Sequence, residues 1–189
     1  MRAEKVYLRP ITAADTARVV AWRNKDFVRK NFIYQKPFTQ EGHMTWLREQ
    51  VEPGHVAQFI ICVAAGEDCL QTKDREIGSV YLRDIDRENE TAEYGVFIGE
   101  EGALGRGYGT EAARLMLAFG FEELGLKKIF LRFLEDNTAA RKSYEKAGFH
   151  MIEERRETVD LEQGKREVFF METERGAWES AKRLRMENR

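Results

Sequence analysis

The sequence of 189 residues contains little cysteine and little proline, with two residues of the first and three of the second. Two cysteines are too few for the disulfide framework of a small secreted domain, so we expect Cys62 and Cys69 to be reduced. Cys62 lies in an apolar run and is expected to be buried, whereas Cys69 lies in a polar loop. No apolar run approaches the ~18 residues that span a bilayer, and no apolar signal region follows Met1. We therefore expect a cytoplasmic protein with no membrane partner.

The sequence also lacks an excess of charge of either sign. The formal net charge is −2, although 34% of the residues are charged. This balance gives no electrostatic reason to expect a nucleic-acid partner. The spacing of histidine, cysteine and aspartate does not resemble a metal site. We therefore expect neither a nucleic-acid partner nor a bound metal.

Patterns of apolar residues predict an α/β domain with a mixed, mostly antiparallel central sheet flanked by helices. Three successive strands at 58–64, 77–85 and 91–98, joined by polar connections, predict an antiparallel meander. A largely apolar helix at 110–124 follows the last of them, and the segment 24–38 is expected to be irregular. The other predicted elements are strands at 5–9, 128–134, 151–159 and 166–172, and helices at 12–23, 39–53 and between Asn137 and Gly148.

The strongest local feature is a glycine-rich loop, residues 105–109, between the strand at 91–98 and the next helix. Glycine lets a ligand approach the backbone, and the first N–H groups of a helix favour an anion such as a pyrophosphate. A P-loop is excluded because Thr110-Glu111 stands where Lys-Ser/Thr is needed. The form GxGxxA is present, but the antiparallel strands before it argue against a dinucleotide fold. A tight loop that only starts a helix is the remaining alternative.

Two motifs in this order resemble the GNAT superfamily of N-acetyltransferases. The loop resembles the family's acetyl-CoA motif, Q/R-x-x-G-x-G/A, with Leu104 at the Q/R position. The segment 135–149 resembles the second motif, N-x-x-A-x-x-x-Y-x-x-x-G-F. The resemblance implies one GNAT domain over residues 1–176, followed by a polar tail at 177–189 that is helical or frayed. Leu8-Arg9-Pro10, Trp22-Arg23-Asn24 and the segment 92–95 further resemble the RimJ/RimL-type branch.

The resemblance implies that acetyl-CoA is the cosubstrate and that a primary amine attacks its thioester directly. It implies Tyr144 as general acid and Glu93 as general base through a water, although either residue could instead only pack or face solvent. Arg141 and Lys142 could equally belong to a solvated helix face. The implied cofactor-binding residues are Val96, Phe97, Ile98, Leu104, Gly105, Arg106, Gly107, Tyr108, Gly109, Thr110, Asn137, Arg141 and Lys142.

The acceptor amine is expected to bind the segment 22–38 and the helix after it. The basic and aromatic residues of this segment favour an anionic acceptor such as an amino-sugar nucleotide. A polyamine or a protein N-terminus is the alternative acceptor, and a sensor that binds acetyl-CoA without turnover is the alternative outside enzymes. We expect a small-molecule amine as partner and a homodimer as assembly. The predicted substrate-binding residues are Trp22, Arg23, Asn24, Arg29 and His43.

Overall fold

A computed structural model describes residues 4–65 and 73–187, so Cys69 lies outside the described residues. The described residues form one seven-stranded sheet with the order β1-β2-β3-β4-β5-β7-β6. Neighbouring strands are antiparallel except β4 and β5, which are parallel. This mixed, mostly antiparallel sheet and its β2-β3-β4 meander confirm the expected fold class. The strands are β1 (Val6–Pro10), β2 (Ala57–Val63), β3 (Arg75–Asp86), β4 (Thr91–Ile98), β5 (Lys128–Leu134), β6 (His150–Leu161) and β7 (Gly164–Glu174).

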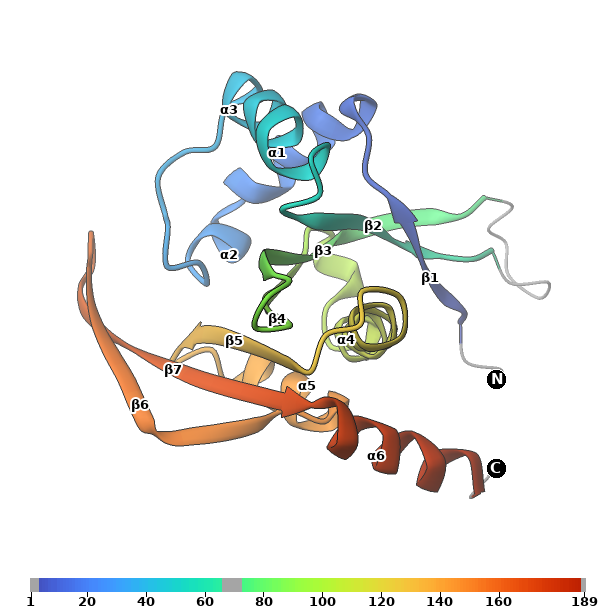
Figure 1. The fold of residues 1–189 in the computed structure, drawn as a ribbon. Coiled ribbons are helices and arrows are strands. Elements are labelled where there is room, and N and C mark those ends of the chain that lie inside the picture. Colours follow the sequence, from blue (N-terminus) through green and yellow to red (C-terminus); the bar gives the residue numbers. More distant parts are fainter. Residues whose placement is uncertain (1–3, 66–72, 188–189) are drawn as a thin grey trace.

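Helices cover both faces of the sheet (Figure 1). One face carries α1 (Thr16–Asn24), α2 (Asp26–Arg29) and α3 (Gln40–Trp46), and the other carries α4 (Tyr108–Ala118), α5 (Thr138–Ala147) and α6 (Arg175–Glu187). The segment 24–38, expected to be irregular, therefore contains one short helix. No helix in the described part of the chain is long and apolar enough to cross a membrane. Short helical turns cover Ala13–Asp15, Leu47–Val51, Glu101–Ala103 and Phe119–Glu123.

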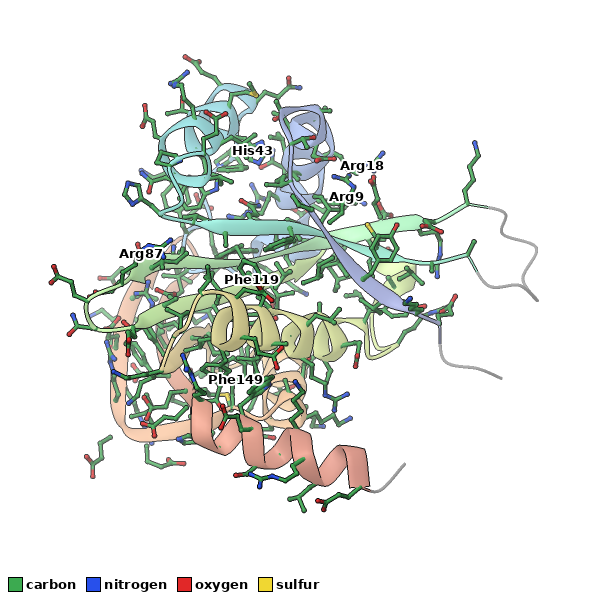
Figure 2. All side chains as sticks on the ribbon, turned by 45° about the vertical axis from the view of Figure 1, so that its right-hand side comes forward. Arg9, Arg18, His43, Arg87, Phe119 and Phe149 are labelled. Carbon is green, nitrogen blue, oxygen red and sulfur yellow. The ribbon has the colours of Figure 1, made fainter. Side chains whose placement is uncertain are left out.

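Each face of the sheet has its own apolar core. On the side of α4 and α5 the core includes Tyr94, Tyr144 and Phe149, whereas the core under α1 and α3 includes Trp22 and Phe97. Figure 2 shows Phe119 and Phe149 on the first side and His43 on the second. Cys62 is buried in the second core, as expected. Because side chains alternate along β4, its residues reach both layers.

The start of α4 depends on a glycine in a left-handed conformation. Gly107 has φ +83° and forms the N-cap, so α4 begins at Tyr108, two residues before the predicted start at Thr110. The Tyr108 hydroxyl donates a hydrogen bond to the Glu4 carboxylate and accepts one from Arg75. The hydrogen bond from Tyr108 lowers the pKa of Glu4. The first residue of α4 is thereby held to the N-terminal segment.

A partly buried ion pair joins β1 to the helical layer. Arg9 donates hydrogen bonds of 2.9 and 2.7 Å to the two carboxylate oxygens of Asp15, and the backbone N–H of Thr12 donates one of 2.8 Å. These hydrogen bonds, led by those of Arg9, lower the pKa of Asp15 to about 2. The pair fixes the direction in which the chain leaves β1 and enters α1.

The C-terminal elements complete the fold at both ends of the sheet. The β6–β7 hairpin rises beside the segment between α2 and α3 (Figure 1), where Ile33 packs with Val168 and Phe170. At the other end, Trp178 of α6 is buried and lies 5.3 Å from Phe121, measured between ring centroids. The domain boundary expected after residue 176 therefore falls inside α6.

Candidate active site

The parallel strands β4 and β5 separate part-way along their length. Their pairing covers Thr91↔Lys128, Ala92↔Ile129 and Glu93↔Phe130, while β4 continues to Ile98 and β5 to Leu134. A cavity of about 1020 Å³ lies at this opening and is lined by residues from both faces of the sheet. Backbone N–H and C=O groups on an unpaired strand edge can bind an extended ligand as an added strand. The edge of β4 from Tyr94 to Ile98 offers such groups to the cavity.

The glycine-rich loop forms one end of the cavity. Gly105 and Gly107 have φ +72° and +83°, and a Cβ atom built on either would meet no atom within 4 Å. Glycine is therefore needed there for its backbone conformation rather than for space. The loop ends on the N-terminus of α4, whose first N–H groups favour an anion. Thr110 lies 2.9 Å from Ser143, measured between the hydroxyl oxygens, and so ties α4 to α5.

Most of the predicted cofactor-binding residues line this cavity, but Arg106 and Arg141 do not. The Arg141 guanidinium donates a hydrogen bond of 2.9 Å to Glu145, one turn further along α5. Residues one turn apart share a helix face, so Lys142 and Lys146 lie together on the cavity side instead. Cofactor binding by Arg106 and Arg141 stays a prediction. The eleven that line the cavity are Val96, Phe97, Ile98, Leu104, Gly105, Gly107, Tyr108, Gly109, Thr110, Asn137 and Lys142.

Tyr144 is buried on the α5 wall of the cavity. Its ring centroid lies 6.0 Å from that of Tyr94, 5.9 Å from that of Phe133 and 6.1 Å from that of Phe149. Its hydroxyl has no hydrogen-bond partner among residues 4–65 and 73–187. Burial raises the pKa of Tyr144, so the phenol keeps its proton at neutral pH. The hydroxyl is thus free to donate to a group within the cavity.

Glu93 lies on the opposite face of β4 and is held by two arginines. Arg83 donates a hydrogen bond of 2.8 Å to Oε1, and Arg132 donates one of 3.1 Å to each carboxylate oxygen. A carboxylate has about four lone-pair positions, so one position on Oε2 is left for a water or an amine. Glu93 is buried rather than solvent-facing, and it orders two cations at the centre of the sheet.

Comparisons with known proteins agree with this geometry. The sequence model described as "Acetyltransferase (GNAT) domain" matches residues 5–150. The chain belongs to the GNAT acetyltransferase family. Membership makes it an acetyl-CoA-dependent N-acetyltransferase, which confirms the reaction and the cosubstrate expected from the two motifs.

Several proteins are similar to this GNAT enzyme over most of its length. A probable N-acetyltransferase, YjcK of Bacillus subtilis, is 30% identical over 79% of this chain and 83% of its own. The spermidine N(1)-acetyltransferase of Escherichia coli K12 is 26% identical over 78% and 74%. An uncharacterized protein of Methanocaldococcus jannaschii, MJ1062, is 29% identical over 81% of this chain, which spans only 30% of that protein. The crystal structure of spermidine N-acetyltransferase from Vibrio cholerae, in complex with CoA and spermine, has the same fold, with a TM-score of 0.79, 19% identity and coverage of 92% and 97%.

The part of the cavity between β4 and the layer of α1, α2 and α3 is called the acceptor half, because the predicted substrate-binding residues come from this layer. Arg23 and His43 line it. Trp22, Asn24 and Arg29 do not line it, and their roles in substrate binding stay predictions.

Trp22, Asn24 and Arg29 make their contacts outside the cavity. The Trp22 ring is buried against Gly99, and its indole N–H donates a hydrogen bond of 2.6 Å to Glu100. The Asn24 amide bonds the backbone of Phe38 at both N–H and C=O, and Arg29 pairs with Asp26 at 3.0 Å. Successive residues on a helix point about 100° apart, so Trp22 and Arg23 face different surroundings.

Tyr81, Arg83 and Arg132 line the cavity and were missed from the sequence. Tyr81 lies over Gly95, where an added Cβ atom would come within 2.3 Å of the tyrosine ring. Burial raises the pKa of Tyr81, and the charges of Arg83 and Arg23 oppose that effect, which places both cations near its hydroxyl. Ser79, Tyr81 and Arg83, which alternate with the apolar residues Val80 and Leu82 of β3, were the signal that pointed to this face.

Proposed function

We propose that this acetyltransferase acetylates the primary amine of a small molecule that also carries an acidic group, such as an amino-sugar nucleotide. The observation that carries the proposal is the charge of the acceptor half. Arg23, Arg83 and Arg132 line it, against the single carboxylate of Glu93. Two of the three arginines already hold that carboxylate, so the remaining positive charge favours an acceptor with a negative group.

A polyamine is the second candidate acceptor, because relatives of this chain are named spermidine acetyltransferases. A polyamine is a chain of cations and needs several carboxylates that are free to pair with it. The described cavity wall has two carboxylates, Glu93 and Asp136, and both are already paired with arginine, the second with Arg166. The charges therefore favour the anionic acceptor over the polyamine. A protein N-terminus is the third candidate.

The proposed reaction forms a bond between the amine nitrogen and the acetyl carbon while the bond from that carbon to sulfur breaks. The amine loses one proton, and the departing thiolate gains one. We assign the second proton to the hydroxyl of Tyr144, which keeps its proton at neutral pH and can donate it as negative charge develops on the departing sulfur. We assign the first to Glu93, whose open Oε2 position can hold the amine or a bridging water. Backbone N–H groups of β4 between Val96 and Ile98 are proposed to polarise the acetyl oxygen.

The deciding experiment is kinetic. The value of kcat/KM should be measured with acetyl-CoA for a 4-amino-sugar nucleotide, spermidine and an N-terminal peptide. The proposal expects the amino-sugar nucleotide to give the highest value. A preference for spermidine that persists when Arg23 is replaced by methionine would overturn the anionic acceptor and leave the acetyltransferase reaction in place. Failure to acetylate any amine, with acetyl-CoA still bound, would favour the sensor alternative.

We also propose the RimJ/RimL-like branch within the family, on the strength of the segments around Arg9, Trp22 and Glu93. The homodimer stays a prediction, to be measured as molar mass by light scattering coupled to size-exclusion chromatography.

A further inference from the structure

The acceptor half of the cavity contains three buried polar atoms that lack a hydrogen-bond partner among the described residues: Nη1 of Arg23, Nε2 of His43 and Nε of Arg83. The Asp84 carboxylate lies 3.6 Å from Nε of Arg83, which leaves the atoms of Arg23 and His43 as the two without a nearby charge partner in the described part of the chain. A buried donor or acceptor without a partner costs free energy, so most buried polar groups in proteins are paired. Two such atoms in the wall of one cavity indicate groups that a ligand completes.

The Arg23 guanidinium is held in place by aromatic rings. Its central carbon lies 3.3 Å from the ring centroid of Phe32, 5.5 Å from that of Phe38 and 5.9 Å from that of Phe97. The rings occupy the faces of the guanidinium, so its N–H groups at the edge are left for hydrogen bonds. Burial lowers the pKa of Arg23, but a guanidinium keeps its charge in proteins. Arg23 therefore presents a fixed, unneutralised cation.

His43 is fully buried, and its Nδ1 lies 2.9 Å from the hydroxyl oxygen of Thr16. The same hydroxyl lies 3.3 Å from the sulfur of Met44. We assign the Thr16 proton to the sulfur, so that the Thr16 oxygen accepts from Nδ1–H of His43. Nε2 then carries a lone pair and no proton. Burial lowers the pKa of His43 against the opposing charge of Asp15, which keeps the ring neutral at pH 7.

The two residues flank one aromatic side chain. The ring of Phe38 lies 5.7 Å from that of His43 and 5.5 Å from the guanidinium carbon of Arg23. We propose that Arg23 and His43 form a recognition subsite, in which Arg23 binds a carboxylate or phosphate and His43 Nε2 accepts a hydrogen bond from a hydroxyl or N–H of the same molecule. This subsite rests on the proposed anionic acceptor. It would hold the end of the acceptor that carries an acidic group next to hydroxyls, as in a sugar acid or a sugar phosphate.

Ligands without an amine test the subsite separately from acetyl transfer. We would titrate the CoA-loaded protein by calorimetry with gluconate, which has a carboxylate followed by a hydroxyl on each further carbon. Sorbitol keeps the hydroxyls without the acid, and hexanoate keeps the acid without the hydroxyls. Glucose 6-phosphate, compared with glucose, is the phosphate arm and distinguishes a phosphate from a carboxylate.

The proposal expects one of the two acids to bind more tightly than its uncharged analogue and, for gluconate, more tightly than hexanoate. Arg23→Met should weaken the binding of that acid by about 10-fold or more, as expected for the loss of a hydrogen bond to a charged group. It should leave the affinity for the uncharged analogue unchanged. Arg29→Met is the matched control, since Arg29 lies in the same segment and outside the cavity, and it should bind as the parent does. If neither acid binds better than its analogue, or if Arg23→Met weakens acid and analogue equally, the subsite is refuted.

The role of His43 needs a variant that folds. His43→Leu should reduce gluconate binding towards that of hexanoate, and retained CoA binding would show that the fold is intact. Thr16→Val is the second variant, because it removes the oxygen that fixes the tautomer and should also reduce the advantage of gluconate. An unchanged advantage in a folded variant would overturn the role of His43. A subsite confirmed in this way in an enzyme that still prefers spermidine would refute the proposed acceptor and not the subsite.

Discussion

The substitution Tyr144→Phe separates proton transfer from packing. The ring of Tyr144 packs against Tyr94, Phe133 and Phe149, and phenylalanine keeps all three contacts. The hydroxyl has no partner among the described residues, so its removal breaks no hydrogen bond within them. The free energy of unfolding should therefore change by less than about 1 kcal/mol. Loss of a general acid typically lowers a rate by ~10²- to 10⁴-fold, which is about 2.7 to 5.4 kcal/mol in activation free energy.

The assay is the release of CoA at saturating substrates, under conditions where chemistry limits the rate. Calorimetric titration should give nearly the same affinity for acetyl-CoA in Tyr144→Phe as in the parent protein. Tyr94→Phe is a matched control, because Tyr94 is also a buried tyrosine whose hydroxyl has no hydrogen-bond partner in the described part of the chain. That control should retain its kcat within about 3-fold. An unchanged kcat in Tyr144→Phe, or an equal loss in both variants, would assign Tyr144 to packing.

Three further predictions concern the cofactor loop, the central carboxylate and the acid stability. Gly109→Val should keep the fold, because an added Cβ meets only Ser143 at 3.6 Å. Its thermal shift should nevertheless be lost at an acetyl-CoA concentration that stabilises the parent by about 2.7 kcal/mol, and a retained shift would contradict the loop's role. Glu93→Gln should lower kcat by at least about 10-fold, and an unchanged kcat would limit Glu93 to positioning Arg132. Asp15 has its pKa lowered from 3.8 to about 2 on folding, so it stabilises the fold above pH ~4, and about 2 kcal/mol is lost as the pH falls to 2. In urea titrations, Asp15→Asn should reduce the fall in the free energy of unfolding between pH ~4 and pH ~2. An unchanged fall would show that Asp15 is not its source.

The fold was predictable because its signals are local. The strands at 91–98 and 128–134 have the predicted bounds, since each is a run of alternating or apolar residues ended by a turn. The start of α4 was wrong by two residues because the left-handed conformation of Gly107, rather than a polar side chain, forms the cap. The residues predicted to bind the cofactor lie in two continuous segments, and eleven of them line the cavity.

The acceptor half was less predictable because it is assembled across strands. Arg83 and Arg132 meet Glu93 only through the pairing of β3 with β4 and of β4 with β5, which no single segment encodes. Charged residues within one short segment predicted a basic acceptor side, and the structure brings only some of them to the cavity. Arg23 lies near the end of α1 and lines the cavity, whereas Arg29 lies in the separate helix α2 and pairs with Asp26.

Because β4 separates from β5, the sheet has a gap between these two strands. The glycine loop and Tyr144 lie on one face of the sheet, and Arg23 and His43 lie on the other. In the proposed reaction, the acetyl donor and the amine therefore approach from opposite faces of the sheet and meet where β4 and β5 separate. The residues proposed to select the acceptor contribute little to the donor side, so we expect that mutations can alter the choice of amine without moving the thioester. We expect enzymes with this arrangement to change their acceptor while they keep one donor.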